Sequence, residues 1–184
     1  APRFVRPGWQ GTWHINGMQH GKLSNVKEIR QLLVADYRLI VFVRNPYTWV
    51  LSVWNNFYRS GESPAFKWFS TLFPERTFEN YCRFVAACAE GLNGSILGAS
   101  TQWSFVENPV KQPDFIGRFE SFDTDTRRLV KLLDIQTEQV PHELRNSPEK
   151  REDWRAYYSP ECFRIVNKLF DEDFARLGYE KTTA

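Results

Sequence analysis

The chain has 184 residues, a length that predicts one globular domain with room for a real hydrophobic core. Its hydrophobic content of 42% is an ordinary globular value and excludes an intrinsically disordered chain. The formal net charge of +2 is too small to indicate binding to nucleic acid or to an anionic membrane surface through bulk charge.

Apolar residues at helical spacing predict a helix over about residues 26–35. The run LIVFV, residues 39–43, is short and continuous, which is typical of a strand buried on both faces of a parallel sheet. Asn45 is a good helix N-cap and Pro46 a good first helical residue, so a helix is predicted from 46 to about 58. This stretch is therefore expected to fold as a strand, a tight turn and a helix.

The rest of the chain is predicted to hold one further strand and three helices. DFIGRF, residues 114–119, has the composition of a second strand. The helices are expected between the Thr77 cap and Gly91, over residues 127–134, and between the Ser159 cap and Gly178. The segments between these elements are expected to be mostly irregular: 59–76, 92–113 and 135–150.

Helices and strands in alternation predict an α/β fold with a parallel sheet. Only two strands are indicated, and a parallel sheet of two strands is not a stable domain. Either the sequence pattern does not reveal every strand, or some strands precede residue 1. No apolar run approaches the roughly 18 residues that a membrane-spanning helix needs, so no such span is expected.

Three cysteines are present, Cys82, Cys88 and Cys162. Their number is odd and their density is low, which argues against a scaffold held by disulfides. Buried free thiols are therefore expected.

Arg44 stands at the carboxyl end of the first predicted strand, where open α/β sheets bind ligands. The helix behind it is expected to offer free backbone N–H groups and the positive end of its dipole, and both favour anions. A guanidinium pairs with phosphate oxygens through two parallel hydrogen bonds. Ser52 lies two helical turns after Asn45 and can add a hydroxyl donor. The structural alternative is a capped helix with Arg44 in an ion pair.

The stretch FVRNPYTWVLSVW resembles the segment that binds the 3′-phosphate in sulfotransferases of the carbohydrate sulfotransferase type. These enzymes use 3′-phosphoadenosine 5′-phosphosulfate (PAPS). The family pattern is an apolar strand, Arg-(Asn/Asp)-Pro, and a serine at the spacing seen here between Arg44 and Ser52. The resemblance implies that these two residues hold the 3′-phosphate. DFIGRFESF, and RNSPEK followed by WRAYYSPECFRIVNKLFDEDFARLGY, are similar to two later family blocks, in the same order.

The resemblance implies an α/β fold of the P-loop-NTPase-like type, with three layers and a central parallel sheet, in a single sulfotransferase-like domain over residues 1–184. The family begins with a strand and a loop, Pro-Lys-(Thr/Ser)-x-(Gly/Ser)-(Thr/Ser), that holds the 5′-phosphosulfate. HGKLSN, residues 20–25, follows no apolar strand and lacks this spacing. We therefore expect an N-terminally incomplete domain without its first strand and loop. A degenerate member that no longer transfers sulfate is the alternative.

Sulfuryl transfer to a hydroxyl needs a general base near neutral pH. The resemblance implies a catalytic histidine about two dozen residues before the 3′-phosphate arginine, in a loop, and His20 stands there relative to Arg44. His20 is thus the candidate base, with a loop histidine of no catalytic role as the alternative. His14 is the second choice, and His142 is expected to be structural. Glu120 is expected to be a buried ion-pair partner of an arginine rather than the base.

The implied reaction moves a sulfuryl group from PAPS to a hydroxyl of a glycan or other small acceptor, with no metal ion and no nucleic acid partner. Four tryptophans could stack on sugar rings, although a place in the core is the favoured interpretation for each: Trp9, Trp13, Trp54 and Trp103. A second hypothesis is a non-catalytic domain that binds a partner or glycan. A third, a kinase-like protein that uses ATP, is weakened by the lack of a Walker motif.

The oligomeric state is left open. The resemblance implies a cytoplasmic protein if the source is bacterial and a protein of the Golgi lumen if it is animal.

Overall fold

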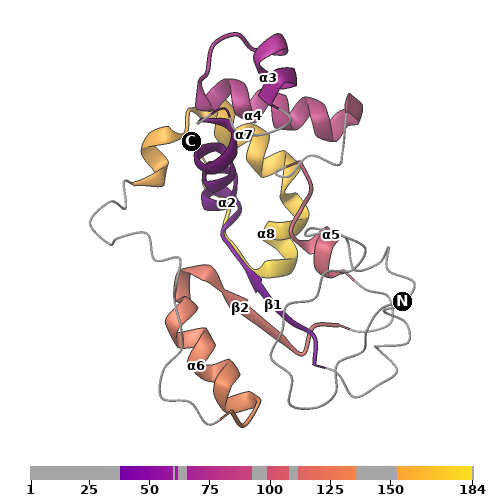
Figure 1. The fold of residues 1–184 in the computed structure, drawn as a ribbon, viewed down its shortest axis with the longest axis vertical. Helices are drawn as coiled ribbons and strands as arrows, with labels where there is room; N and C mark the ends of the chain where they lie inside the picture. The colour runs from indigo at the N-terminus through magenta and orange to yellow at the C-terminus, as the bar shows by residue number, and fades with distance from the viewer. Residues whose placement is uncertain are drawn as a thin grey trace.

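The computed structural model describes residues 38–59, 61, 66–92, 99–107, 112–135 and 153–183. The small sheet lies at one end of these residues, and α2, α3, α4 and α7 gather at the other (Figure 1). The elements in chain order are β1 (Ile40–Val43), α2 (Pro46–Val53), the π-helical turn η2 (Trp54–Tyr58), α3 (Phe66–Leu72), α4 (Phe78–Ala87), the π-helical turn η3 (Cys88–Leu92), α5 (Trp103–Val106), β2 (Phe115–Arg118), the 3₁₀ turn η4 (Phe119–Ser121), α6 (Phe122–Leu132), the 3₁₀ turn η6 (Trp154–Tyr157), α7 (Pro160–Leu169) and α8 (Asp171–Leu177).

β1 and β2 pair in parallel, with Ile40 opposite Phe115 and Val43 opposite Arg118. Both predicted strands and their parallel arrangement are therefore confirmed, and the described residues form a mixed α/β structure. The helix predicted over residues 26–35 lies outside the described residues, as does almost all of the predicted loop 135–150.

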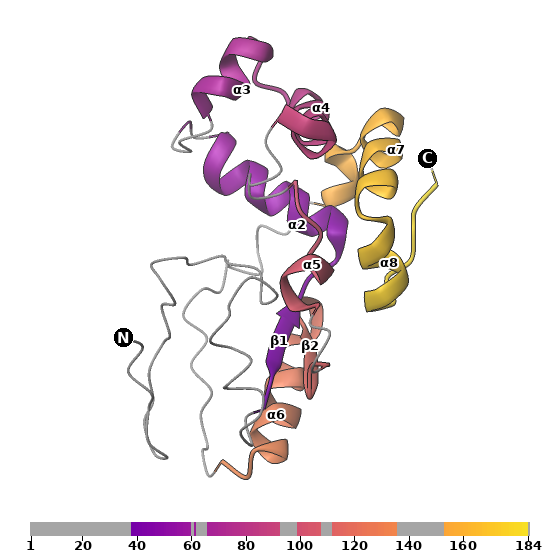
Figure 2. The same ribbon diagram turned by 90° about the vertical axis from the view of Figure 1, so that its right-hand side faces the viewer.

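Helices lie on both faces of the sheet (Figure 2). On one face, the ring of Phe42 contacts Phe122 of α6, with 5.1 Å between the ring centroids. On the other face, Val43 packs with Trp103 of α5 and Leu177 of α8. The cover is incomplete: Val43 is buried, but Phe42 is 36% exposed, so the expectation of a strand buried on both faces is wrong for the face that carries Phe42.

The main hydrophobic core lies between α2, α4 and α7 and is largely aromatic. Tyr47 stacks on Trp154 with 4.9 Å between the ring centroids, and Tyr58 contacts Tyr81 at 4.6 Å. Rings in such offset and tilted pairs bury large apolar areas and add a favourable electrostatic contact. The three cysteines lie in this same core as buried free thiols, which confirms the expectation for them.

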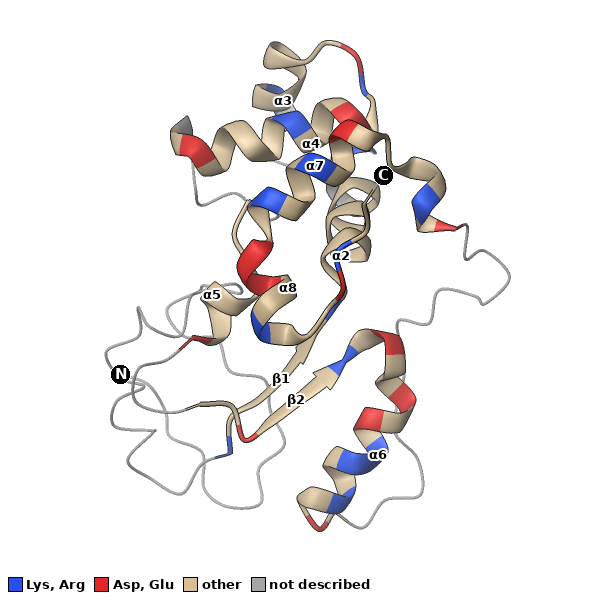
Figure 3. Ribbon diagram, turned by 180° about the vertical axis from the view of Figure 1, so that it is seen from behind, with Lys and Arg blue, Asp and Glu red and all other residues tan. Residues whose placement is uncertain are grey.

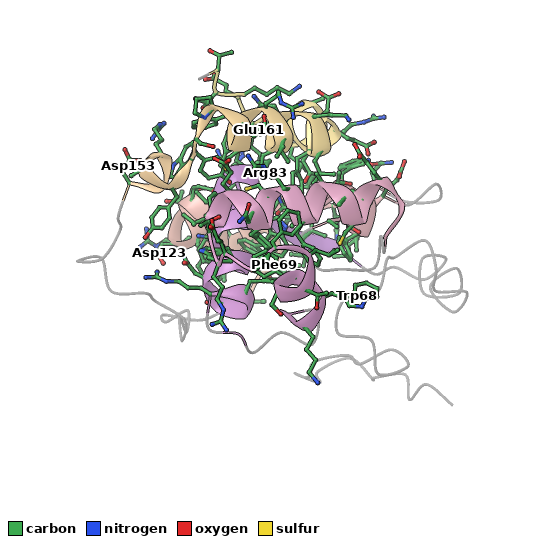
Figure 4. The ribbon with its side chains drawn as sticks, turned by 90° about the horizontal axis from the view of Figure 1, so that it is seen from above. Trp68, Phe69, Arg83, Asp123, Asp153 and Glu161 are labelled. Atoms are coloured by element: carbon green, nitrogen blue, oxygen red, sulfur yellow. The ribbon has the colours of Figure 1, made fainter. Side chains whose placement is uncertain are left out.

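α3 lies inside a segment that was expected to be irregular. Its side chains alternate between two environments: Phe69 points toward α4 and is fully buried, whereas Trp68 points outward and is 50% exposed (Figure 4). Phe69 contacts Phe84 with 5.5 Å between the ring centroids. Packing on α4 therefore orders a helix of seven residues whose own pattern is too short to identify it.

α6 begins at Phe122, earlier than the predicted helix over residues 127–134. Its first turn holds acidic residues and its last turn is basic, which Figure 3 shows as red followed by blue along the helix. Charges in this order stabilise a helix through its dipole. The contact between Phe122 and the sheet anchors the added turn.

The last predicted helix is two helices. Ser159 caps α7, and Gly178 ends α8 in the left-handed region at φ 67°, both as expected. Between them Phe170, whose ring is fully buried, has non-helical angles of φ −105° and ψ 24°. The change of direction brings α8 against α5. Within the described residues, no helix is long and apolar enough to cross a membrane.

Candidate functional site

The turn between β1 and α2 has the predicted arrangement. Arg44 directly follows the last residue of β1. Asn45 caps α2, because its side-chain oxygen accepts a hydrogen bond from the Tyr47 amide at 3.0 Å, and Pro46 is the first helical residue. A guanidinium therefore stands at the carboxyl end of a parallel strand, the usual ligand-binding edge of α/β sheets.

The Arg44 side chain contacts residues from both sides of the turn. Its Nε donates a hydrogen bond to Thr48 Oγ1 at 3.1 Å. Its guanidinium carbon lies 4.7 Å from the centroid of the Phe119 ring, in the range of a cation–π contact. Thr48 belongs to the first turn of α2, whereas Phe119 directly follows β2. The segments that follow β1 and β2 therefore both contact this side chain and hold it at the end of the sheet.

A polar row runs along one side of α2 and the turn that follows it. Thr48, Ser52 and Asn56 recur every four residues along it, and Arg44, which precedes the helix, joins this row through its hydrogen bond to Thr48. Ser52 Oγ accepts a hydrogen bond from Asn56 Nδ2 at 3.3 Å. Tyr47 and Val50 point the other way and are fully buried in the core. The sequence prediction named Arg44 and Ser52 but missed Thr48, although the four-residue spacing could have identified it.

The backbone amides at the start of α2 are already engaged. The Asn45 amide donates to Glu120 Oε1 at 2.7 Å, and the Tyr47 amide donates to the Asn45 side chain. Pro46 has no N–H to offer. The expectation of free backbone donors is therefore wrong for these three positions, so recognition of an anion here falls mainly to side chains.

Glu120 is exposed, so the expectation that it is a buried ion-pair partner is wrong. Its two carboxylate oxygens accept from neutral donors, the Asn45 amide and the Tyr179 hydroxyl, the latter at 3.0 Å. Burial, and then the negative charge of Glu120, raise the pKa of Tyr179 above its ordinary value. Glu120 thus links the end of β2 to the start of α2 and to the segment after α8.

The side chain of Gln102 holds the backbone of Arg44. The Arg44 amide donates to Gln102 Oε1 at 2.8 Å, and Gln102 Nε2 donates to the Arg44 carbonyl at 2.6 Å. Behind it, the carboxylate of Asp173 accepts from the backbone amides of Gln102 and Trp103 at 2.8 and 2.7 Å. Asp173 is fully buried, and this desolvation raises its pKa despite the two amide hydrogen bonds.

Residues 13–180 match the sequence pattern of the family described as the sulfotransferase family. The chain belongs to this family. It is similar to carbohydrate sulfotransferase 12 of Xenopus laevis, with 25% identity over 188 residues, and of Mus musculus, with 22% identity. Each alignment covers 89% of this chain and 44% of the relative, so the chain spans less than half the length of these proteins. No solved structure matches at a significant level.

Several candidate residues of this sulfotransferase-family chain lie outside the described residues: His14, His20, His142, Trp9, Trp13 and the stretch HGKLSN. Trp54 and Trp103 are only 4% and 8% exposed and belong to the core, which was the favoured interpretation for both over stacking on a sugar ring. Among the residues that the structure describes, no group of His, Cys, Asp and Glu side chains is arranged to hold a metal ion.

Proposed function

We propose that this sulfotransferase-family chain binds PAPS and moves its sulfuryl group to a hydroxyl of a carbohydrate-type acceptor. The observation that carries the proposal is the position of Arg44 at the end of β1, with Thr48 and Ser52 on the same side of α2. The acceptor class is supported by the two relatives, which are named carbohydrate sulfotransferases.

The polar row suits a phosphate group. A guanidinium presents five N–H donors in one plane, a geometry that matches the oxygens of a phosphate. Charge-assisted hydrogen bonds from arginine to phosphate are stronger than those between neutral groups. With the amides of Asn45 and Tyr47 engaged, Arg44 and Ser52 are proposed to hold the 3′-phosphate, the group that distinguishes PAPS from ATP.

His20 is proposed as the general base that takes the proton from the acceptor hydroxyl. PAPS, when bound, supplies the sulfuryl group; the acceptor oxygen bonds to sulfur as the bond to the departing bisphosphate breaks, by analogy with phosphoryl transfer. No metal ion is part of the proposal.

We also propose that residues 1–184 form one domain with a P-loop-NTPase-like arrangement of three layers. A parallel pair of strands with helices on both faces supports this arrangement. The matched range 13–180, which covers most of the chain, supports a single domain.

Calorimetric titration with adenosine 3′,5′-bisphosphate tests the 3′-phosphate site. Saturable binding is expected, with Arg44→Ala about 10- to 100-fold weaker because a hydrogen bond to a charged group is lost. Arg59→Ala is the matched control: this exposed arginine lies at the end of the same helical segment, where it contacts Asn55. Equal binding of ATP, or unchanged affinity in Arg44→Ala, would contradict the proposal.

Transfer is tested separately, with labelled PAPS and a panel of glycans. His20→Ala should abolish labelling of the acceptor while the affinity for adenosine 3′,5′-bisphosphate stays unchanged. Binding of the bisphosphate by the unaltered protein without transfer to any glycan would favour the second candidate, a non-catalytic domain that keeps the nucleotide site.

A further inference from the structure

We propose that Gln102 is a positioning residue for Arg44, held in place by Asp173, and that it sets the preference of the site for a ligand with a 3′-phosphate. The inference rests on the proposed function of Arg44. Gln102 contacts the backbone of Arg44 through the two hydrogen bonds described above. Its effect on a ligand would therefore pass through the arginine.

The pairing of β1 explains why Gln102 meets Arg44 with both of its polar groups. The Leu39 carbonyl accepts from the Asp114 and Phe115 amides, so the backbone of Leu39 faces β2. Along a strand, the backbone groups of successive residues point to alternate edges. Arg44, five positions later, therefore directs its N–H and C=O to the edge away from β2. Gln102 lies at that edge.

A primary amide carries one acceptor and one donor side by side, as a neighbouring strand would present them. At the end of β1, the Gln102 side chain thus makes the two hydrogen bonds to the Arg44 backbone that a neighbouring strand would otherwise make. Both hydrogen bonds are short, at 2.8 and 2.6 Å. They hold the peptide groups on both sides of the Arg44 Cα, which determine the direction in which its side chain leaves the backbone.

Asp173 holds Gln102 in the position from which it binds the backbone of Arg44. Its carboxylate binds the amides of Gln102 and Trp103, so the start of α5 is tied to α8. The ring of Trp103 packs with Val43 and Leu177 and holds the same segment against the sheet. A buried carboxylate with two amide donors is costly to displace, because the buried charge would lose both hydrogen-bond partners.

The Arg44 side chain contacts Thr48 and the ring of Phe119, which is 43% exposed. A long side chain turns a small rotation of its backbone into a large displacement of its guanidinium. Misplacement of a charged hydrogen-bond donor lowers recognition of the group it faces much more than it lowers general binding.

The test compares two ligands that differ only in the 3′-phosphate, adenosine 3′,5′-bisphosphate and adenosine 5′-monophosphate. Gln102→Met keeps the length of the side chain but removes both hydrogen bonds. We expect it to reduce the preference for the bisphosphate about tenfold, with the affinity for the monophosphate unchanged. Asp173→Asn should change the preference in the same direction. Ser104→Ala is the matched control in α5 and should leave the preference unchanged, since the Ser104 hydroxyl donates to the Thr101 carbonyl and not to Gln102 or Arg44.

A role limited to stability would weaken both ligands equally in Gln102→Met or lower only the melting temperature, and either result would overturn the inference. If Gln102→Met does not fold, Gln102→Asn, whose amide is too short to reach both groups of Arg44, must show the reduced preference. If Arg44→Ala loses the preference and the Gln102 variants keep it, only this inference fails. If the unaltered protein has no preference, or Arg44→Ala keeps it, the proposed function fails with it.

Discussion

Glu120 Oε1 lies 2.7 Å from the backbone nitrogen of Asn45, so a carboxylate occupies the start of the helix that carries the proposed phosphate site. The same oxygen is 3.5 Å from Thr48 Oγ1, the hydroxyl that also accepts from Arg44. A negative charge at this position stabilises α2 through its dipole. It also opposes the binding of any anion at the polar row.

Glu120→Gln should therefore strengthen the binding of adenosine 3′,5′-bisphosphate. Glutamine keeps an oxygen for the Asn45 amide and removes the charge that repels the ligand. Because two unit charges about 4 Å apart and screened by water interact by about 1 kcal/mol, we expect a gain of about 3- to 10-fold, which shrinks at high salt. Calorimetry at two salt concentrations measures it.

Glu75→Gln provides the control, as Glu75 is an exposed carboxylate between α3 and α4 and should not affect the affinity. Weaker binding in Glu120→Gln would mean that the carboxylate orders the site more than it repels the ligand.

Two buried tyrosines allow the contribution of a hydroxyl hydrogen bond to the free energy of unfolding to be measured. Tyr158 Oη donates to the Tyr47 carbonyl at 2.8 Å and so fastens the segment before α7 to α2. Tyr81 Oη, also in the core, has no hydrogen-bond partner within the part of the chain that the structure describes. Tyr158→Phe should lower the free energy of unfolding by about 1 kcal/mol, whereas Tyr81→Phe should leave it unchanged or raise it.

Urea denaturation followed by tryptophan fluorescence measures both variants. An equal loss in the two would show that the hydrogen bond of Tyr158 adds no stability beyond that of a buried hydroxyl without a partner.

The stability of the folded protein should depend on pH through Asp125, which binds the end of β2. This carboxylate accepts from the Arg118 amide at 2.8 Å, the Ser121 hydroxyl at 2.7 Å and the Arg128 guanidinium at 2.8 Å. The Arg118 amide, then the other two donors, lower the pKa of Asp125. A carboxyl whose pKa is lower in the folded state adds stability above its unfolded pKa, about 3.9, and loses it as the pH falls toward the folded value.

Asp125→Asn should therefore destabilise the protein at pH 7, and the difference from the unaltered protein should narrow as the pH falls below about 4. Urea midpoints at several pH values measure this. The control is Glu180→Gln, at an exposed carboxylate near the C-terminus. A difference that is independent of pH would assign the effect to the geometry of the amide rather than to the charge of Asp125.

The parts of the structure that the sequence predicts are those with local causes. Asn45 and Pro46 define the start of α2, and Ser159 and Gly178 mark the outer ends of α7 and α8, because capping depends on residues within one helical turn. The apolar run before Arg44 likewise identifies β1, and with it the location of the candidate site.

The missed parts depend on contacts between distant segments. Gln102 and Asp173 lie 58 and 129 residues along the chain from Arg44, and nothing in their spacing signals that they meet. Glu120 follows an arginine in the sequence, yet its partners come from α2 and from the chain after α8. The position of the guanidinium could be predicted from sequence, but its supports could not.

The three thiols should be protected in the native protein, although the pKa of one of them is lowered. Burial raises the pKa of Cys82 and Cys88, whereas a hydrogen bond from Cys82, supported by Ser159, lowers the pKa of Cys162 to about 7. A thiolate is the reactive form, so Cys162 would be the most reactive of the three if reagents could reach it. All three are at most 1% exposed.

Iodoacetamide at pH 7.5 should therefore label none of the three cysteines in the native protein and all three in urea, as counted by intact mass. During brief partial unfolding, Cys162 should be labelled first, because it lies in the first turn of α7 and has the lowest pKa. Peptide mapping identifies the labelled residue, and the rate in urea serves as the reference for an unprotected thiol. Labelling of Cys162 in the native protein at that reference rate would mean that the first turn of α7 does not stay packed against α4.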